Sequence, residues 1–398
     1  MSRAASVAVD LGVAARLGWR ALRRRLGGTH AAAPDLVGFR SQCEALLARA
    51  PAGLIAQHQI IELPATRPPW SPSGWPLEAG DSITSLACGR TLLSRPLDIW
   101  VEPSFQLWLR IGEQGPVFRG TRNTHSFVAS HAGALQLASY FPGEWASPDG
   151  RLATSERDYA KVSGSICVLL IRWCRGIDAA DGVAALAAIG DVQGLLAGER
   201  ERLARAAGES EPAGWRHLWF LGPSEIYRRA PRDHHADAIC CSTHRDVAIL
   251  QHDAELALMP DTRLHWSWKV DALPSSLRED SIPTHDYLSI AVEFDNGLDL
   301  TYLWSAALPV GTHFRCPLPT WKDRETHWVV RSGSAELGRW LDESRNVYDD
   351  YRIAIGGTVP TRIVRVWLIA VSLFQRGEGR CAYAGIRLSQ GNTELKID

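Results

Sequence analysis

One strand-like segment, residues 285–294, carries the side chains best suited to chemistry. Neighbouring residues of a β-strand point to opposite faces, so the alternation along this segment divides it into two sets. The first set is apolar apart from one acid and consists of Asp286, Leu288, Ile290, Val292 and Phe294. The second set contains an imidazole, a phenol, a hydroxyl and a carboxylate and consists of His285, Tyr287, Ser289, Ala291 and Glu293. We expect the first face to pack in a core and the second to contact a ligand.

Other polar and aromatic residues of the same half would surround this second face if their strands are its neighbours. A sheet face of this kind suits a carbohydrate, because aromatic rings stack on apolar ring faces and charged side chains bind hydroxyl or carboxylate groups. The sequence therefore predicts a groove that binds a carbohydrate-like or other polar ligand on a concave sheet face. Its predicted contacts are His265, Trp268, Lys269, His285, Tyr287, Glu293, Arg331 and Arg365.

Three other interpretations of these residues stay open. A lyase or hydrolase acting on a glycan would use His285 or Tyr287 as general base and Arg331 to stabilise developing negative charge. Against catalysis, the chain has no glycine-rich phosphate loop, no Gly-x-Ser-x-Gly sequence and no His-Glu-x-x-His sequence. The aromatic faces could instead form protein interfaces in an assembly. The polar residues could also be the solvated faces and ends of ordinary strands.

A short segment dense in soft ligands, residues 234–244, raises the question of zinc. It contains His234, His235, Asp237, Cys240, Cys241 and His244. Cys240 and Cys241 are neighbours in a predicted strand and so point to opposite faces, and no CxxC pair supports them. We therefore expect no metal at this segment, and no cofactor is predicted.

The bulk composition narrows the class of protein. At 398 residues the chain is long enough for two domains. Its formal net charge of -1 argues against nucleic acid as a partner, since phosphate binding needs a basic surface. The 8 Cys residues are irregularly spaced, and no export signal precedes them. No apolar run approaches the length of about 18 residues that a membrane helix needs, so we expect a cytoplasmic protein with reduced thiols.

By composition the chain divides into four parts. They are a helical arm with a lead-in strand over 1–70, a β-sandwich over 75–176, a helical linker over 177–214 and a jelly-roll-like domain over 215–398. Residues 3–27 predict a basic amphipathic helix, able to pack on the body or to dock on a protein or a membrane surface. A polar and apolar pattern near 335–354 predicts a helical insertion in the last part. The fold class is thus mainly β, with two sandwich or jelly-roll domains.

Residues 79–175 contain four spaced strand motifs. They are Gly80-Asp81-Ser82-Ile83-Thr84, Arg110-Ile111-Gly112, Phe127-Val128-Ala129 and Leu135-Gln136-Leu137-Ala138-Ser139-Tyr140. In type and order these motifs resemble the calcium-dependent galactophilic bacterial lectins, which implies a galactose-binding-like sandwich. The chain departs from that family where its metal loop begins, with Phe141-Pro142 in place of Asn-Asp. The following loop offers only Glu144 and Asp149 as weak candidates for calcium ligands, so the resemblance does not imply a calcium site.

The last part of the chain carries a second set of motifs. They include Leu264-His265-Trp266-Ser267-Trp268-Lys269-Val270, His285-Asp286-Tyr287, Tyr302-Leu303-Trp304-Ser305 and Val329-Val330-Arg331-Ser332-Gly333. Over 215–398 these motifs resemble a bacterial family of unknown function, and the resemblance implies no particular activity. The identity of the ligand and the oligomeric state stay open at this point.

Overall fold

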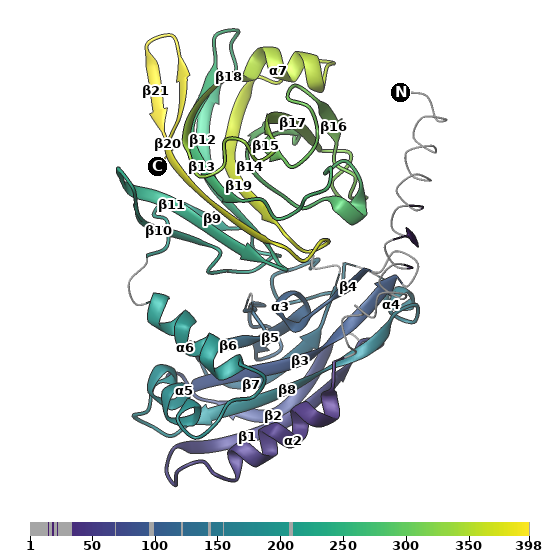
Figure 1. The fold of residues 1–398 in the computed structure, drawn as a ribbon, viewed down its shortest axis with the longest axis vertical. Coiled ribbons are helices and arrows are strands. Elements are labelled where there is room, and N and C mark those ends of the chain that lie inside the picture. The colour runs from purple at the N-terminus through teal and green to yellow at the C-terminus, as the bar shows by residue number, and fades with distance from the viewer. Residues whose placement is uncertain are drawn as a thin grey trace. The chain divides into compact units, whose positions relative to one another are not determined.

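The computed structural model contains two compact units, Met1–Gly208 and Glu209–Asp398 (Figure 1). The described residues are 15, 18, 19, 22 and 34–397, apart from 68, 95–98, 121, 142–144, 154 and 207–209. The helix predicted over 3–27 therefore lies almost wholly outside the described residues, as does Glu144. Within the described part, no helix has both the length and the apolar character needed to span a membrane.

The first unit is built on two antiparallel sheets. One sheet has the order β1 (Ile55–Pro64), β8 (Ser163–Trp173), β3 (Ser82–Ser94) and β4 (Ile99–Val101), and β6 (Thr124–Val128) also pairs with β3. The other has the order β2 (Trp70–Leu77), β7 (Gly133–Ser139) and β5 (Leu107–Ile111). Alternate residues such as Ile83, Leu137 and Leu170 form one apolar core, in which each is fully buried. This is the sandwich that the alternation and the lectin resemblance predicted.

Helices form a further layer of the first unit. They are α2 (Leu36–Leu47), α5 (Ala179–Ala187) and α6 (Leu195–Ala206), and two single-turn helices are α3 (Pro103–Gln106) and α4 (Glu156–Tyr159). Side chains of α2 and α5, including Phe39 and Leu186, share a second core with Leu169 of β8. The segment predicted as a linker therefore contributes apolar side chains to the first unit.

The second unit also contains two large sheets. The six-stranded sheet has the order β10 (Tyr227–Arg232), β11 (His235–His244), β20 (Glu378–Gln390), β13 (Arg263–Ala272) and β18 (Trp340–Asn346), with β21 (Thr393–Lys396) beside β20. The seven-stranded sheet has the order β16 (His313–Arg315), β17 (Glu325–Ser332), β15 (Asp299–Ser305), β14 (Tyr287–Phe294), β19 (Arg362–Val371), β12 (Val247–Ala257) and β9 (Arg216–His217). The prediction of a mainly β chain with sandwich-type sheets is confirmed.

The core of the second unit lies between these two sheets. On β13 the inward side chains Leu264, Trp266 and Trp268 are buried, whereas His265 and Lys269, which point the other way, are partly exposed. The indole of Trp266 stacks on the ring of Tyr302 from the facing sheet, with 5.6 Å between ring centroids. The alternation in this segment therefore predicted its two faces correctly.

The helical insertion predicted near 335–354 is wrong over its first half. Residues Trp340–Asn346 form strand β18, paired in antiparallel register with β13. Only Val347–Ala354 form a helix, α7, whose first turn is capped by the Asn346 side chain accepting from the Asp349 backbone N–H at 3.0 Å. Pairing with a neighbouring strand outweighs the local pattern here, because the edge of the sheet would otherwise leave backbone groups of β13 unpaired.

A third layer covers the outer face of the seven-stranded sheet. Apolar side chains from connecting segments, including Leu218, Leu308 and Trp321, pack with Tyr287 and Trp367 of that face. Strand β14 is consequently buried along its whole length on both faces. The prediction of an accessible polar face on 285–294 is therefore wrong. Alternation in the sequence shows which residues share a face, but it does not show which other segments cover that face.

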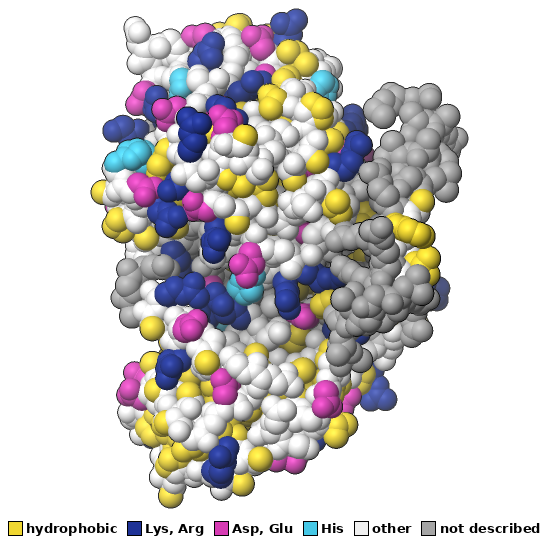
Figure 2. Space-filling view, viewed as in Figure 1, with side chains coloured by type: hydrophobic (Ala, Val, Ile, Leu, Met, Phe, Trp, Pro, Cys, Tyr) yellow, Lys and Arg dark blue, Asp and Glu magenta, His cyan; other side chains and the backbone are white. Residues whose placement is uncertain are grey.

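The surface carries mixed charge where it is displayed. On the face shown in Figure 2, basic and acidic side chains are interspersed with hydrophobic ones. This mixture agrees with the formal net charge of -1.

Candidate functional site

Four side chains that suit a metal or proton chemistry meet in the interior of the second unit. They are His285, Cys316, Glu325 and His327, and one ligand atom of each lies within 4.8 Å of those of the others. Glu325 and His327 are two residues apart on β17 and so share a face. Cys316 directly follows β16, the partner of β17, and His285 precedes β14. All four are at most 4 % exposed.

The contacts inside this cluster are hydrogen bonds except for the looser approach of His327 to Glu325. Cys316 Sγ lies 3.4 Å from His285 Nε2, and His327 Nε2 lies 3.4 Å from Glu325 Oε1. The Tyr287 hydroxyl donates to Glu325 Oε1 at 3.1 Å, and the Thr301 hydroxyl donates to the same atom at 3.3 Å. The cluster therefore converges on the Glu325 carboxylate.

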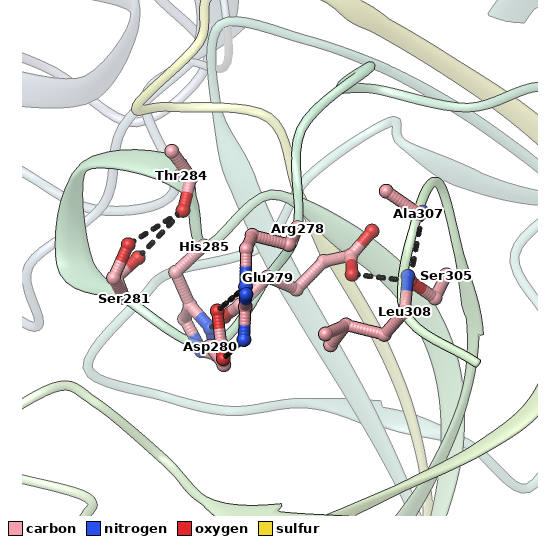
Figure 3. A network of polar contacts seen from close by, with 9 residues as sticks. All are labelled: Arg278, Glu279, Asp280, Ser281, Thr284, His285, Ser305, Ala307 and Leu308. Carbon is pink, nitrogen blue, oxygen red and sulfur yellow. Dashed lines mark hydrogen bonds and ion pairs between the residues drawn. The ribbon is translucent and has the colours of Figure 1, made fainter. Parts of the chain in front are cut away.

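The orientation of the His285 ring is determined by the segment before it. His285 Nδ1 lies 2.7 Å from the Glu279 carbonyl oxygen, which can only accept, so Nδ1 carries the proton and Nε2 presents a lone pair. The Glu279 carboxylate in turn accepts from Ser305 Oγ at 2.5 Å and from the Ala306 backbone N–H at 2.6 Å. Figure 3 shows this carboxyl group pointing from its segment toward the chain at Ser305. Two connecting segments thus hold the imidazole in place.

Burial shapes the ionisation of these groups. It lowers the pKa of His285 to about 3, assisted by the neighbouring His327, so the imidazole is neutral at pH 7. Burial raises the pKa of the Cys316 thiol, and the Glu325 carboxylate raises it further. Burial alone would raise the pKa of Glu325, but attraction to His327 outweighs it and lowers the value to about 2. Burial also raises the pKa of Glu279 to about 7.

A second group of polar and aromatic side chains lies on the outer face of the six-stranded sheet. Trp340 of β18 stands opposite Lys269 of β13. Asp233, in the turn between β10 and β11, accepts from Lys269 Nζ at 2.8 Å and from Trp340 Nε1 at 2.9 Å. The His235 ring lies 4.2 Å from the Trp340 ring between centroids. Hydrogen bonds to Lys269 and to the Trp340 indole hold the pKa of Asp233 below its usual value.

The same outer face continues along β13. The Ser267 hydroxyl donates to Asp342 Oδ1 of β18 at 2.5 Å. His265 Nε2 lies 2.9 Å from the Ser389 hydroxyl of β20. Burial lowers the pKa of His265, and the nearby Arg387 adds to this effect. Partly exposed groups from several strands therefore form one polar surface beside the Trp340 indole.

The structure distributes the eight predicted contacts over several places. His265 and Lys269 lie on the outer face just described, whereas His285 and Tyr287 lie under the third layer. Trp268 is fully buried in the core between the sheets, where its indole N–H donates to Glu343 Oε1 at 3.1 Å. The predicted single groove is therefore not brought together.

The remaining predicted cations are engaged by acids. Arg331 Nε donates to Glu343 Oε1 at 2.6 Å, and its Nη1 lies 3.1 Å from Glu336. Arg365 Nη1 donates to Glu293 Oε2 at 2.8 Å. The contacts of Arg331 thus go to acids on other segments, away from the His285 and Tyr287 pair that a catalytic role would have required.

Two segments were considered as metal sites from the sequence, the loop with Asp149 and residues 234–244. Asp149 accepts from the Ser147 hydroxyl, and its backbone carbonyl accepts from Arg110 Nη1 at 2.6 Å. In the segment 234–244, Cys241 is buried opposite Cys381 of β20, whereas Cys240 on the other face is only partly buried. This separation of the two neighbouring thiols agrees with the alternation argument against zinc at that segment.

Sequence reasoning missed three members of the buried cluster. Glu325 and His327 form a Glu-x-His pair in a strand, and this spacing alone places both side chains on one face. That signal was available in the sequence. Cys316 had no comparable signal, because its place beside His285 depends on how β16 and the covering segments fold over the sheet.

Comparisons with solved structures return a lectin domain, a xyloglucanase domain and a xylanase at low similarity. A lectin domain described as "EclA N-terminal domain; PllA-like lectin" is 18 % identical, with a TM-score of 0.23, over 31 % of this chain and 99 % of that one. The xyloglucanase domain of NopAA from Sinorhizobium fredii is 6 % identical, with a TM-score of 0.28, over 46 % of this chain and 96 % of its own. A wild-type xylanase called ENZbleach is 8 % identical, with a TM-score of 0.27, over 48 % of this chain and 89 % of its own. None of these likenesses assigns a ligand or an activity to this chain.

Comparisons at the level of sequence place only the second unit. No curated protein matches the chain. Residues 213–387 match the family model described as "Protein of unknown function (DUF3047)". The C-terminal region of the chain thus matches a family of unknown function, in agreement with the resemblance stated over 215–398.

Proposed function

We propose that this is a non-catalytic binding protein whose C-terminal sandwich holds a carbohydrate-like ligand on the outer face of the six-stranded sheet. The observation that carries the proposal is the arrangement around Asp233, which accepts from both Lys269 Nζ and the Trp340 indole N–H. An aromatic ring with fixed polar neighbours offers a sugar both a stacking surface and hydrogen-bonding groups.

The outer face is suited to a hydroxyl-rich ligand in a second respect. Its groups are held by one another before any ligand arrives, as in the Ser267 to Asp342 hydrogen bond at 2.5 Å. Side chains that are ordered in advance lose less conformational entropy on binding, so the entropic penalty of binding is smaller. Two of the predicted contacts, His265 and Lys269, belong to this face, so the proposal retains part of the groove expected from the sequence.

The face of β14 is a poorer place for such a ligand. Every residue from Tyr287 to Phe294 is buried, and a sugar would have to displace apolar side chains such as Leu308 and Trp321. The proposal therefore places the carbohydrate-like ligand on β13 and β18 and leaves His285 and Tyr287 out of its contacts.

The experiment is a glycan array with the full-length protein, followed by titration calorimetry on the best glycan. We expect Trp340→Ala and Asp342→Asn each to weaken binding at least tenfold. The matched control is Trp219→Ala, because Trp219 is 41 % exposed in the same unit and lies outside this face. Circular dichroism would verify that each variant is folded.

Two results would count against the proposal. The first is an array on which the folded wild-type protein retains no glycan. The second is a glycan whose affinity falls equally in the Trp340 and Trp219 variants, which would indicate non-specific aromatic contact. Loss confined to the Trp340 and Asp342 variants would support it.

A further inference from the structure

We infer that His285, Cys316, Glu325 and His327 form a binding site for one transition metal ion of the zinc class. The four side chains offer two imidazole nitrogens, one sulfur and one carboxylate oxygen, all within 4.8 Å of one another. They come from three separate segments of the second unit. The inference concerns the buried cluster and is independent of the ligand proposed for the outer face.

Two separations inside the cluster match the edges of a metal coordination shell, and all four ligand atoms lie within 4.8 Å of one another. Zinc binds imidazole nitrogen at about 2.0–2.1 Å and thiolate sulfur at about 2.3 Å, so neighbouring donors of a tetrahedron lie about 3.3–3.6 Å apart. Cys316 Sγ and His285 Nε2 are separated by 3.4 Å, and so are His327 Nε2 and Glu325 Oε1. A charge-assisted N–H to carboxylate hydrogen bond would be shorter, about 2.7–2.9 Å. The His327 and Glu325 pair is therefore spaced more like two ligands of one ion than like a hydrogen-bonded pair, and the Cys316 thiol already faces the His285 Nε2 lone pair.

His327 supplies an independent observation. Its side chain is fully buried, and neither ring nitrogen makes a hydrogen bond; the approach of Nε2 to Glu325 Oε1 stays at 3.4 Å. Buried polar groups are almost always satisfied, so an imidazole left in this state calls for an explanation. A metal ion bound at Nε2 would satisfy the nitrogen that faces Glu325.

Hydrogen bonds from neighbouring residues fix the orientation of two of the four donor side chains, as is common for metal ligands. His285 donates from Nδ1 to the Glu279 carbonyl oxygen at 2.7 Å, which directs Nε2 into the cluster. The Tyr287 and Thr301 hydroxyls both donate to Glu325 Oε1 and orient that carboxylate. Metal-binding histidines commonly donate their other N–H to a carbonyl or a carboxylate, and ligating carboxylates commonly accept further hydrogen bonds.

The donor set selects the class of metal. Calcium and magnesium prefer an all-oxygen shell, whereas this cluster offers one oxygen-bearing side chain among four. Thiolate and imidazole donors in a four-coordinate shell are typical of zinc. The Cys316 thiol would release its proton to solvent as the metal–sulfur bond forms.

Four protein donors complete a tetrahedron, which is the pattern of a structural site. His285 belongs to the segment before β14, where its ring lies against those of Tyr287 and His327, and Cys316 belongs to the segment after β16. Glu325 and His327 belong to the sheet itself. A bound ion would therefore fasten these two segments to β17.

Cobalt(II) is the probe for the test, because its complexes with thiolate ligands absorb strongly in the near ultraviolet. The full-length protein would be stripped with a chelator, confirmed as folded by circular dichroism and titrated with cobalt(II). We expect saturation at an equimolar amount of cobalt, a sulfur-to-cobalt band, and loss of that band when zinc is added. The wild-type titration decides the matter even where a variant fails to fold.

Variants then assign the donors. Cys316→Ser should abolish the sulfur-to-cobalt band, and His327→Gln should weaken cobalt binding at least tenfold, a typical loss for a missing ligand. Cys381→Ala is the matched control, because Cys381 is buried in the same unit but lies in the core on β20. The inference is overturned if the folded wild-type protein takes up no cobalt. It is equally overturned if the sulfur band survives in Cys316→Ser or vanishes in Cys381→Ala alone.

Discussion

Cys316 Sγ lies 3.4 Å from His285 Nε2, although 31 residues separate them in sequence. Between these two residues the chain forms β14, β15 and the edge strand β16. The contact therefore joins two connecting segments that share no backbone pairing. The connecting segments that cover the sheet are thus held by a polar contact as well as by apolar packing.

Truncation of Trp268 should test its place in the core. Its side chain is fully buried, and its ring centroid lies 5.5 Å from that of Trp304. We expect Trp268→Ala to lower the free energy of unfolding of the second unit by about 3–5 kcal/mol, because the change removes transfer energy and leaves a cavity. Urea unfolding followed by circular dichroism would measure it. Trp219 is 41 % exposed and its ring contacts that of Phe220, so Trp219→Ala should cost clearly less than Trp268→Ala.

The buried acid Glu199 should be sensitive to removal. It is fully buried, lies 2.6 Å from Arg202 Nη2 and accepts from the Thr124 hydroxyl at 2.6 Å. Glu199→Ala removes the carboxylate that both groups face, and breaking such a pair typically costs about 3–5 kcal/mol. The exposed pair of Lys161 and Asp158 is the control, since Asp158→Ala should cost less than about 1 kcal/mol. Equal losses in chemical denaturation of the two variants would contradict the expectation.

Two glycines with the same backbone conformation should respond differently to alanine. Gly150 has φ +83, and a Cβ there would lie 2.4 Å from Trp70 Cζ2. Gly53 has φ +80 and would meet nothing within 4 Å. Gly53→Ala should cost only the left-handed backbone penalty of about 1–2 kcal/mol. The clash in Gly150→Ala should add about 1–3 kcal/mol, as a lower Tm of the first unit would report.

The Asp233 carboxylate should stay ionised to unusually low pH. Hydrogen bonds to Lys269 and to the Trp340 indole hold its folded-state pKa below the unfolded value, so the folded chain binds fewer protons than the unfolded chain in acid. The contribution of this group to stability is therefore complete above about pH 4, the unfolded pKa, and is lost as pH falls through the lower folded pKa. Carbon-detected NMR titration of the carboxyl group should give a midpoint below the ordinary aspartate value. In Lys269→Met the midpoint should rise, and no change there would refute the assignment of the cause.

Alternation predicted some strands better than others for a physical reason. On β13, Trp266 and Trp268 face a core while Lys269 faces outward, so polarity and burial change together along the strand. On β14 the two faces are buried by different partners, one by the opposite sheet and one by connecting segments. Periodicity in the sequence cannot reveal the second kind of burial, because the covering residues lie far away in the chain.

The candidate sites divide in the same way. The Glu325 and His327 pair is visible from its spacing of two in a strand, and Lys269 was expected on a polar face. Their partners were not predictable from spacing. Asp233 contacts Lys269 from the turn between β10 and β11, where it has a positive φ, and Cys316 belongs to the segment after β16. Local pattern therefore predicts which face a side chain joins, and the long-range fold decides what it meets there.

The order of strands in the second unit has a consequence for its synthesis. Strand β19 lies between β12 and β14, and β20 lies between β11 and β13, so both sheets have late-made strands at interior positions. While the ribosome is still making residues 362–390, each sheet lacks a central member and its neighbours expose unpaired edges. Folding of this unit must therefore wait for those strands to emerge, whereas the sheets of the first unit are already complete once β8 has left the exit tunnel.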